Sequence, residues 1–303
     1  LVIRLIARLG RGTVLIVGPS NYKLMLAGIH TMQALTAGNA ALIKPGRGAE
    51  PVMQRFRALL IEAGIPSELC QVLDEATGSA HEAIRAGVDH VTFTGSRDAG
   101  LAVQATAAQH NTPSVMELSG CDFALVCDDA DLSLAAKALT YGLRFNAGDT
   151  CMRPCRAYVH ESRADALAEA IHQRLAAVPA VSVSAEAARQ TCRLIDRAIE
   201  QGAEPITPLP ANAAWHPVVL DRATADMALM HEAAPLPVLM LRRFTDESAV
   251  IDDANNGADA LTASVFSASP GRADRLADEL RAGAVLINDM IVPTADPRLP
   301  FHA

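Results

Sequence analysis

Short apolar segments alternate with helix-forming segments in the first part of this chain, and this alternation constrains the fold most. Strands are expected near residues 12–18, 40–44, 70–74 and 90–94, and an apolar helix after the first strand ends near Ala37. Alternation at this spacing is typical of parallel βαβ units. The chain is therefore predicted to be an α/β protein with a parallel sheet in its first part.

Polar residues follow three of these predicted strands. Asn21 follows the first, Lys44 ends the second, and Gly95 and Ser96 end the strand that begins at His90. Open parallel sheets bind ligands beyond the carboxyl ends of their strands, and the helix after Ser96 has free N–H groups that suit a pyrophosphate. Each residue also has an ordinary interpretation, since Asn21 suits a turn or helix cap and Lys44 a plain strand end.

One cysteine and one glutamate suggest covalent chemistry. Cys151 follows the glycine turn of residues 146–150, and Glu117 stands in the apolar stretch 115–118. A thiolate attacks carbonyl groups, and a nearby carboxylate takes a proton from the thiol or from a later water. Alone the pair is weak evidence, because a single cysteine after a glycine is often a small buried hydrophobe.

Several short strings, in their order and spacing, resemble the aldehyde dehydrogenase superfamily from about Gly12 to Phe301. The matching strings are Pro19-Ser20-Asn21, Lys44-Pro45, Phe93-Thr94-Gly95-Ser96, Glu117-Leu118-Ser119-Gly120, Gly148-Asp149-Thr150-Cys151, Asp128-Asp129-Ala130-Asp131, Ala254-Asn255-Asn256 and Ala282-Gly283-Ala284-Val285-Leu286-Ile287-Asn288. No single string is specific, but their combination indicates the family's fold.

The resemblance implies an aldehyde dehydrogenase-like α/β fold with two domains. Residues 1–116 correspond to a partial Rossmann-type NAD(P)-binding domain, with residues 1–10 as a remnant of an oligomerisation arm, and residues 117–303 to the α/β catalytic domain. The chain looks like a divergent member shortened at both ends, and the full-length form is expected to be a homo-oligomer. In the catalytic half we expect strands near residues 123–127 and 157–159 and helices at residues 163–178 and 272–281, whereas residues 180–225 show no clear pattern.

The same resemblance assigns roles to the three candidate catalytic residues. Cys151 would attack the aldehyde to form a thiohemiacetal, and the Asn21 side-chain amide would stabilise the developing oxyanion together with the Cys151 backbone N–H. Loss of hydride to the cofactor gives a thioester, which Glu117 would hydrolyse by activating water. The implied reaction is NAD(P)-dependent oxidation of an aldehyde to a carboxylic acid.

Cofactor binding is predicted for Lys44, Arg47, Gly95, Ser96 and Leu118, and the cofactor is NAD or NADP. Arg47 stands where the family often has a glutamate that binds the adenosine ribose. Because a guanidinium pairs well with a 2′-phosphate, Arg47 favours NADP.

Departures from the family pattern leave two alternatives open. The family's Glu-x-Phe-Gly-Pro, whose glutamate holds the nicotinamide ribose, aligns with Ala233–Pro237, which lacks both the carboxylate and the aromatic ring. Asp149 also places a negative charge near Cys151, which is expected to raise the pKa of the thiol. The chain could thus be a catalytically degenerate binding or assembly subunit. A coenzyme-A-acylating relative is disfavoured because the deacylating Glu117 is present.

Composition excludes several other classes of protein. The net charge of −8 gives no reason to expect a nucleic-acid partner, and no apolar run is long enough to span a bilayer. The six cysteines lack a paired framework and fit a reducing cytoplasm, and no Cys/His spacing indicates a metal site. The expected partner is a small aldehyde substrate.

Overall fold

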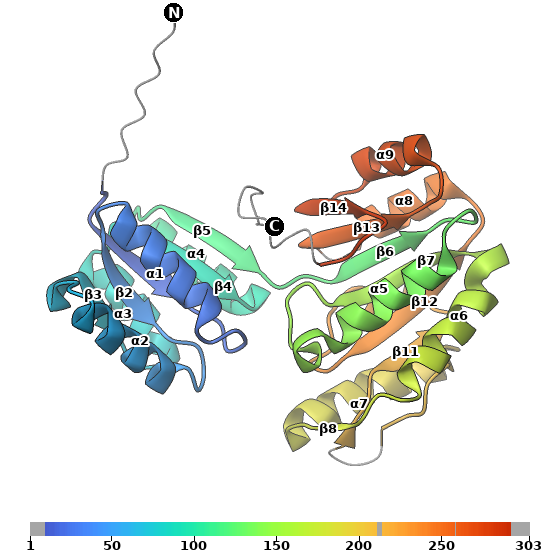
Figure 1. The fold of residues 1–303 in the computed structure, drawn as a ribbon, viewed down its shortest axis with the longest axis horizontal. Coiled ribbons are helices and arrows are strands. Elements are labelled where there is room, and N and C mark those ends of the chain that lie inside the picture. The colour runs from blue at the N-terminus through green and yellow to red at the C-terminus, as the bar shows by residue number, and fades with distance from the viewer. Residues whose placement is uncertain (1–9, 211–213, 258, 292–303) are drawn as a thin grey trace, which may run out of the picture. The chain divides into compact units, whose positions relative to one another are not determined.

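The chain divides into two compact units between Leu118 and Ser119 (Figure 1). The computed structural model describes residues 10–210, 214–257 and 259–291. Of the predicted oligomerisation arm at residues 1–10, all but the last residue lies outside the described residues. The division falls after Leu118 rather than after residue 116, so Glu117 belongs to the first unit.

The first unit is a five-stranded parallel sheet with helices on both faces. Its strand order is β3-β2-β1-β4-β5, with all neighbours parallel. The strands are β1 (Thr13–Val17), β2 (Ala40–Lys44), β3 (Cys70–Val72), β4 (His90–Gly95) and β5 (Ser114–Leu118), and the helices are α1 (Met25–Thr36), α2 (Glu50–Glu62), α3 (Thr77–Ala86) and α4 (Arg97–Gln109). This arrangement confirms the predicted parallel sheet.

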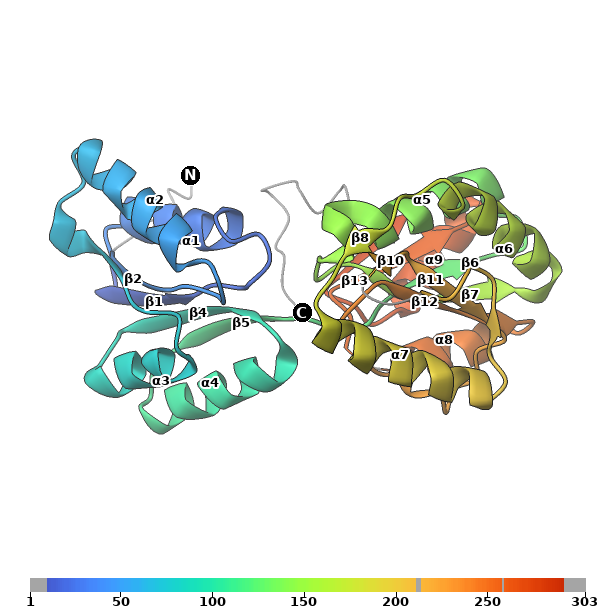
Figure 2. The ribbon, with the colours of Figure 1, turned by 90° about the horizontal axis from the view of Figure 1, so that it is seen from below.

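Alternation along β1 explains the two cores of this unit. Val14 and Ile16 pack with α1 and α2, whereas Leu15 and Val17 pack with α3 and α4, because successive side chains of a strand point to opposite faces. Figure 2 shows α1 and α2 on one side of the sheet and α3 and α4 on the other. Because helices cover both faces of this sheet, a ligand can reach it only at the ends of the strands.

The second unit is built on a seven-stranded sheet of order β14-β13-β6-β7-β12-β11-β9. All neighbours are parallel except β9, which runs antiparallel to β11. The strands are β6 (Asp122–Val126), β7 (Pro154–His160), β9 (Glu204–Pro205), β11 (Val218–Asp221), β12 (Val238–Phe244), β13 (Thr262–Phe266) and β14 (Ala284–Ile287), and β8 (Val181–Ser182) pairs separately with β10 (Ala214–Trp215).

Helices cover both faces of the second sheet. They are α5 (Leu132–Arg144), α6 (Glu161–Leu175), α7 (Ala185–Glu200), α8 (Glu247–Asn255) and α9 (Pro270–Glu279). One core joins α5 and α6 to the sheet, and the other joins α7, α8 and α9. Asp131 begins α5 by accepting hydrogen bonds from the backbone N–H groups of Ser133 and Leu134.

Several elements differ from the predicted ones in their bounds. The helix expected at 163–178 begins at Glu161 and ends at Leu175, and the helix expected at 272–281 ends at Glu279. Leu280 follows that helix in extended backbone and is buried. Within the described residues, no helix combines the length and the apolar character needed to cross a bilayer.

Candidate active site

The carboxyl edge of the first sheet gathers most of the predicted site residues. Asn21 lies in the loop after β1, Lys44 ends β2, Gly95 ends β4, and Glu117 is the penultimate residue of β5. The register pairs Thr94 with Glu117. The strand order changes direction between β1 and β4, which makes their carboxyl ends the switch point where such sheets bind ligands.

Asn21 is half-buried in the loop that connects β1 to α1. Helix α1 begins at Met25 with Leu24 at its N-cap position, so Asn21 lies outside the helix and does not cap it. Its neighbour Tyr22 has a φ of 42°, in the left-handed region that non-glycine residues rarely adopt. The helix-cap interpretation of Asn21 is therefore wrong. Asn21 instead lies in a turn in which the next residue has left-handed backbone.

The side chains at the end of β5 have different surroundings. Glu117 is 9% exposed, so its carboxylate is largely shielded from solvent. Leu118 packs toward α4, where a β-carbon on Gly100 would lie 2.1 Å from its Cδ2 atom. Gly100 leaves room for Leu118, and this packing gives Leu118 a structural role in addition to the predicted cofactor role.

The start of α4 suits a pyrophosphate group. Ser96 is the N-cap residue with extended backbone, and its side chain makes no capping hydrogen bond to the described first turn. The first backbone N–H groups of a helix lack intrahelical partners and carry the positive end of the helix dipole. These donors, at the switch point of the sheet, fit a dinucleotide.

Lys44 is accompanied by carboxylates that the sequence analysis did not single out. Burial lowers the pKa of Lys44, while Glu75 and Asp74 act in the opposite direction by attraction. Glu75 also accepts a 2.6 Å hydrogen bond from the backbone N–H of Gly48, whereas Arg47 is exposed. The predicted ribose-binding region thus has acidic as well as basic side chains.

In the second unit, Cys151 follows a turn of left-handed residues. Asn146, Ala147 and Gly148 have φ values of 51°, 56° and 80°. Glycine is required at the last of these positions, because a β-carbon there would lie 2.1 Å from Cγ of Pro237. Cys151 is half-buried, unlike Cys155, which is buried in β7, so the thiol is not simply a core residue. Consecutive strained residues of this kind are typical of functional sites.

Arg153 connects the Cys151 loop to the segment that replaces the family's Glu-x-Phe-Gly-Pro. Its side chain is buried, donates a 2.6 Å hydrogen bond from Nη1 to the carbonyl of Gly148, and donates from Nη2 to the carbonyl of Ala234. The thiol of Cys155 also donates to the Arg153 carbonyl. One guanidinium therefore fixes both main-chain segments, although they are far apart in sequence.

Replacing Arg153 with methionine is expected to lower the free energy of unfolding by about 2–3 kcal/mol, since two buried carbonyls lose a charged donor. The same change should reduce the turnover number, because the Cys151 turn loses a support. Arg153→Lys is the control: it keeps the charge but cannot bridge both carbonyls with planar geometry, so an intermediate loss is expected. Urea denaturation of the three proteins measures the effect, and equal midpoints would show that the guanidinium contributes nothing.

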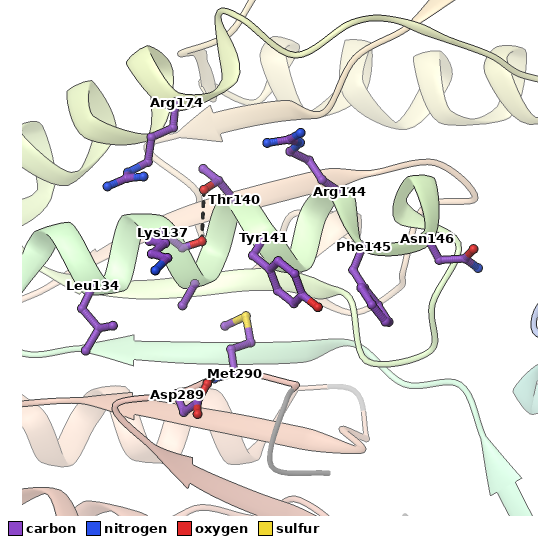
Figure 3. A pocket seen from close by; sticks show the side chains of 11 residues that line it. Leu134, Lys137, Thr140, Tyr141, Arg144, Phe145, Asn146, Arg174, Asp289 and Met290 are labelled. Atoms are coloured by element: carbon purple, nitrogen blue, oxygen red, sulfur yellow. Dashed lines mark hydrogen bonds between the residues drawn. The ribbon is translucent and has the colours of Figure 1, made fainter. Parts of the chain in front are cut away.

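A cavity of about 930 Å³ lies beside the same turn, wholly within the second unit. Asn146 contributes to its wall, and Figure 3 shows Lys137 and Tyr141 along α5 and Phe145 just after it, with Arg174 from α6 and Met290 from the segment after β14. The Asn146 amide also donates a 2.8 Å hydrogen bond to the carbonyl of Asp149. The described residues contain no group of His, Cys, Asp and Glu side chains arranged to hold a metal.

The site residues are thus divided between the two units. The first contains Asn21, Glu117 and all the predicted cofactor residues, and the second contains Cys151. The sequence analysis missed Arg153, Glu75 and the cavity along α5. Arg153 could have been noticed as a charged residue near the nucleophile, but nothing in the sequence identifies its partner at Ala234.

Comparisons with known proteins give a consistent result. The model of the "Aldehyde dehydrogenase family" matches residues 3–302. The chain is 34% identical to 4,4'-diapolycopene aldehyde oxidase of Methylomonas sp, over 96% of this chain and 57% of the relative. It is 31% identical to vanillin dehydrogenase of Pseudomonas fluorescens, over 96% of this chain and 64% of that protein.

Solved structures show the same likeness. The NADP-dependent glyceraldehyde-3-phosphate dehydrogenase of Bacillus halodurans C-125, complexed with NADP, superposes with a TM-score of 0.90 at 30% identity, covering 95% of this chain and 63% of that one. An NAD-dependent aldehyde dehydrogenase from Sinorhizobium meliloti gives a TM-score of 0.89 at 28% identity, covering 97% and 62%. The chain spans about 57–64% of the length of these relatives.

Proposed function

The chain belongs to the aldehyde dehydrogenase family, and from this we propose that it oxidises an aldehyde to a carboxylic acid with NAD or NADP. The observation that carries the proposal is the placement of Cys151, a half-buried thiol shortly after the left-handed turn at residues 146–148, which a buried arginine holds in place. Aldehyde-dependent formation of NADH or NADPH, followed by absorbance, tests it. A protein that binds the cofactor but reduces none with any aldehyde would contradict it.

Cys151 acts as the nucleophile in this proposal. Its sulfur adds to the aldehyde carbon, and the carbonyl oxygen becomes an alkoxide that requires hydrogen-bond donors. The Asn21 side-chain amide and the Cys151 backbone N–H supply these donors. The turn at residues 146–148 fixes the backbone from which that N–H points, so less ordering is needed when the substrate arrives.

Glu117 acts after oxidation. The bound nicotinamide cofactor supplies a hydride acceptor, and the acyl group then remains on Cys151 as a thioester. Glu117 takes a proton from water, which attacks the thioester and releases the acid. The low exposure of Glu117 supports this role, because a carboxylate shielded from bulk solvent can act on a single water within the site.

The first unit provides the residues that would hold the cofactor. The N–H groups at the start of α4 would hold the pyrophosphate, and Lys44 would donate to a ribose hydroxyl. Arg47 is exposed and able to pair with a 2′-phosphate, whereas Glu75 lies close enough to influence Lys44. The balance between Arg47 and Glu75 would set the choice between NAD and NADP.

Arg47→Glu is expected to reverse a preference for NADP over NAD, and to weaken NADP binding about tenfold, since a carboxylate repels the phosphate that a guanidinium binds. Fluorescence titration of NADPH and NADH measures both affinities. Glu75→Gln is the companion variant: it removes a negative charge while keeping an acceptor for the Gly48 N–H, and should improve NADP binding. Equal affinities for both cofactors in the wild type and the Arg47 variant would show that Arg47 faces solvent in the complex.

A second function is a binding or assembly subunit without catalysis. The observation in its favour is the segment Ala233–Pro237, which has no carboxylate to hold the nicotinamide ribose. In its place Arg153 binds the Ala234 carbonyl and Gly148 packs on Pro237. Cofactor binding without turnover would support this alternative.

The cysteines are consistent with a reducing compartment. All six are free thiols, and four of them are buried. Secreted proteins usually use pairs of cysteines as disulfides. We therefore propose that the protein works in the cytoplasm, where Cys151 would stay reduced.

A further inference from the structure

The cavity along α5 has an apolar wall made largely from one face of that helix. Leu134, Lys137 and Tyr141 recur at helical spacing on this face, and Phe145, the residue after the helix, lines the cavity with them. The rings of Tyr141 and Phe145 lie 5.4 Å apart at an angle of 35°. Tyr141 is 42% exposed, so its ring is accessible to a ligand in the cavity.

Basic side chains surround this apolar surface. Lys137 and Arg144 come from α5 and Arg174 from α6, against one carboxylate, Asp289. In the described part of the chain none of these three cations forms an ion pair, although Arg174 donates a 3.4 Å hydrogen bond to the hydroxyl of Ser133. Elsewhere in the same unit, by contrast, Arg243 pairs with three carboxylates. Among the described lining residues, three cations thus stand against one carboxylate, which gives the cavity an excess of positive charge.

The cavity also adjoins the loop of the nucleophile. Its wall includes Asn146, and the chain continues through the turn to Cys151. Along α5, Lys137 lies about 10 Å from Arg144, the last residue of the helix, at the rise of an α-helix. A ligand with its reactive group at the Cys151 end would therefore need an extended apolar body to reach Lys137 and Arg174.

We propose that this cavity binds the non-reacting part of an aldehyde that carries a carboxylate at its far end. The carboxylate pairs with Lys137 and Arg174, and the apolar chain lies on Tyr141 and Phe145. The inference rests on the proposed function, since it names the substrate class of that reaction. The preferred substrates are ω-oxo carboxylates rather than neutral aldehydes of the same length.

The test compares two aldehydes that differ only in the distal group, 9-oxononanoate and nonanal. The wild type should have the higher kcat/KM for 9-oxononanoate, and Lys137→Gln or Arg174→Gln should each lower that advantage about fivefold, as for a partly exposed ion pair. The double variant should lose it. Arg193→Gln is the matched control, because Arg193 is also exposed and in the same unit, but on α7 outside the cavity.

Binding of the product separates this inference from the proposed function. Nonanedioate should bind more tightly than nonanoate in calorimetric titrations of the wild type, and the double variant should bind both equally. If neither aldehyde is oxidised but this binding difference is found, the proposed reaction is wrong, whereas the proposed carboxylate-binding site at Lys137 and Arg174 is supported. Equal binding of the two acids, or an equal loss of kcat/KM for both aldehydes in the double variant, would overturn the inference.

Discussion

Cys151→Ala is expected to remove aldehyde-dependent reduction of NAD(P), with a loss of about 10³-fold or more in kcat, because the proposed covalent adduct forms on its sulfur. The fold should be unaffected, since Cys151 is half-buried and its loop is held by Arg153 through main-chain carbonyls. Stopped-flow absorbance measures hydride transfer, and circular dichroism checks the fold.

The choice of control cysteine follows from the structure. Cys192 is also half-buried, but it lies on α7, so Cys192→Ala should retain full activity. Cys155 is a poorer control because its thiol hydrogen-bonds to the Arg153 carbonyl and so contacts the same loop. A Cys151→Ala protein that retains most of the wild-type rate would exclude the covalent mechanism.

Glu117→Gln is expected to separate the two halves of the reaction. Oxidation still proceeds once per site, giving a burst of NADH or NADPH equal to the enzyme concentration, and steady turnover then falls about 10²- to 10⁴-fold because water is no longer activated. Rapid-quench mass spectrometry should find the acyl group on Cys151. Glutamine keeps the size of the side chain, so the packing around β5 is preserved.

Glu68→Gln serves as the matched control, since Glu68 is an exposed glutamate of the same unit in a short 3-10 helix. Undiminished steady turnover in the Glu117 variant would show that its carboxylate has a structural role instead. Rescue of turnover by added coenzyme A would indicate that thiols accept the acyl group, as an acylating dehydrogenase requires.

The first unit could be predicted well from the sequence because its signals are local. Strands β1 and β2 are short apolar runs with clear ends, and the ligand-binding edge follows from parallel connectivity. The positions of Asn21, Lys44 and Gly95 at that edge follow from the sequence, because each comes at or just after the end of a predicted strand. The carboxylate of Glu75 was missed because its proximity to Lys44 depends on the pairing of β2 with β3.

The second unit was harder to predict, for reasons that lie in particular residues. Helix α7 falls in the stretch from 180 to 225 where no pattern was recognised, because its buried face consists mainly of small or weakly apolar side chains. These residues are Ala188, Thr191, Ile195 and Ala198. The contact between Arg153 and Ala234 joins positions 81 residues apart. Every residue has a main-chain carbonyl, so the sequence does not indicate which carbonyl Arg153 binds.

Because Arg153 binds the main-chain carbonyl of Ala234 rather than a side chain, the contact does not depend on which residue stands at that position. A change of the side chain at 234 therefore leaves this acceptor in place, whereas Gly148 cannot be replaced, since any side chain there meets the Pro237 ring and the Leu143 carbonyl. Side chains in the 233–236 segment can thus differ while the backbone of the segment keeps the same path. In a laboratory evolution experiment, the exposed positions 233 and 235 should accept diverse replacements, whereas the buried position 234 should stay small and position 148 should stay glycine.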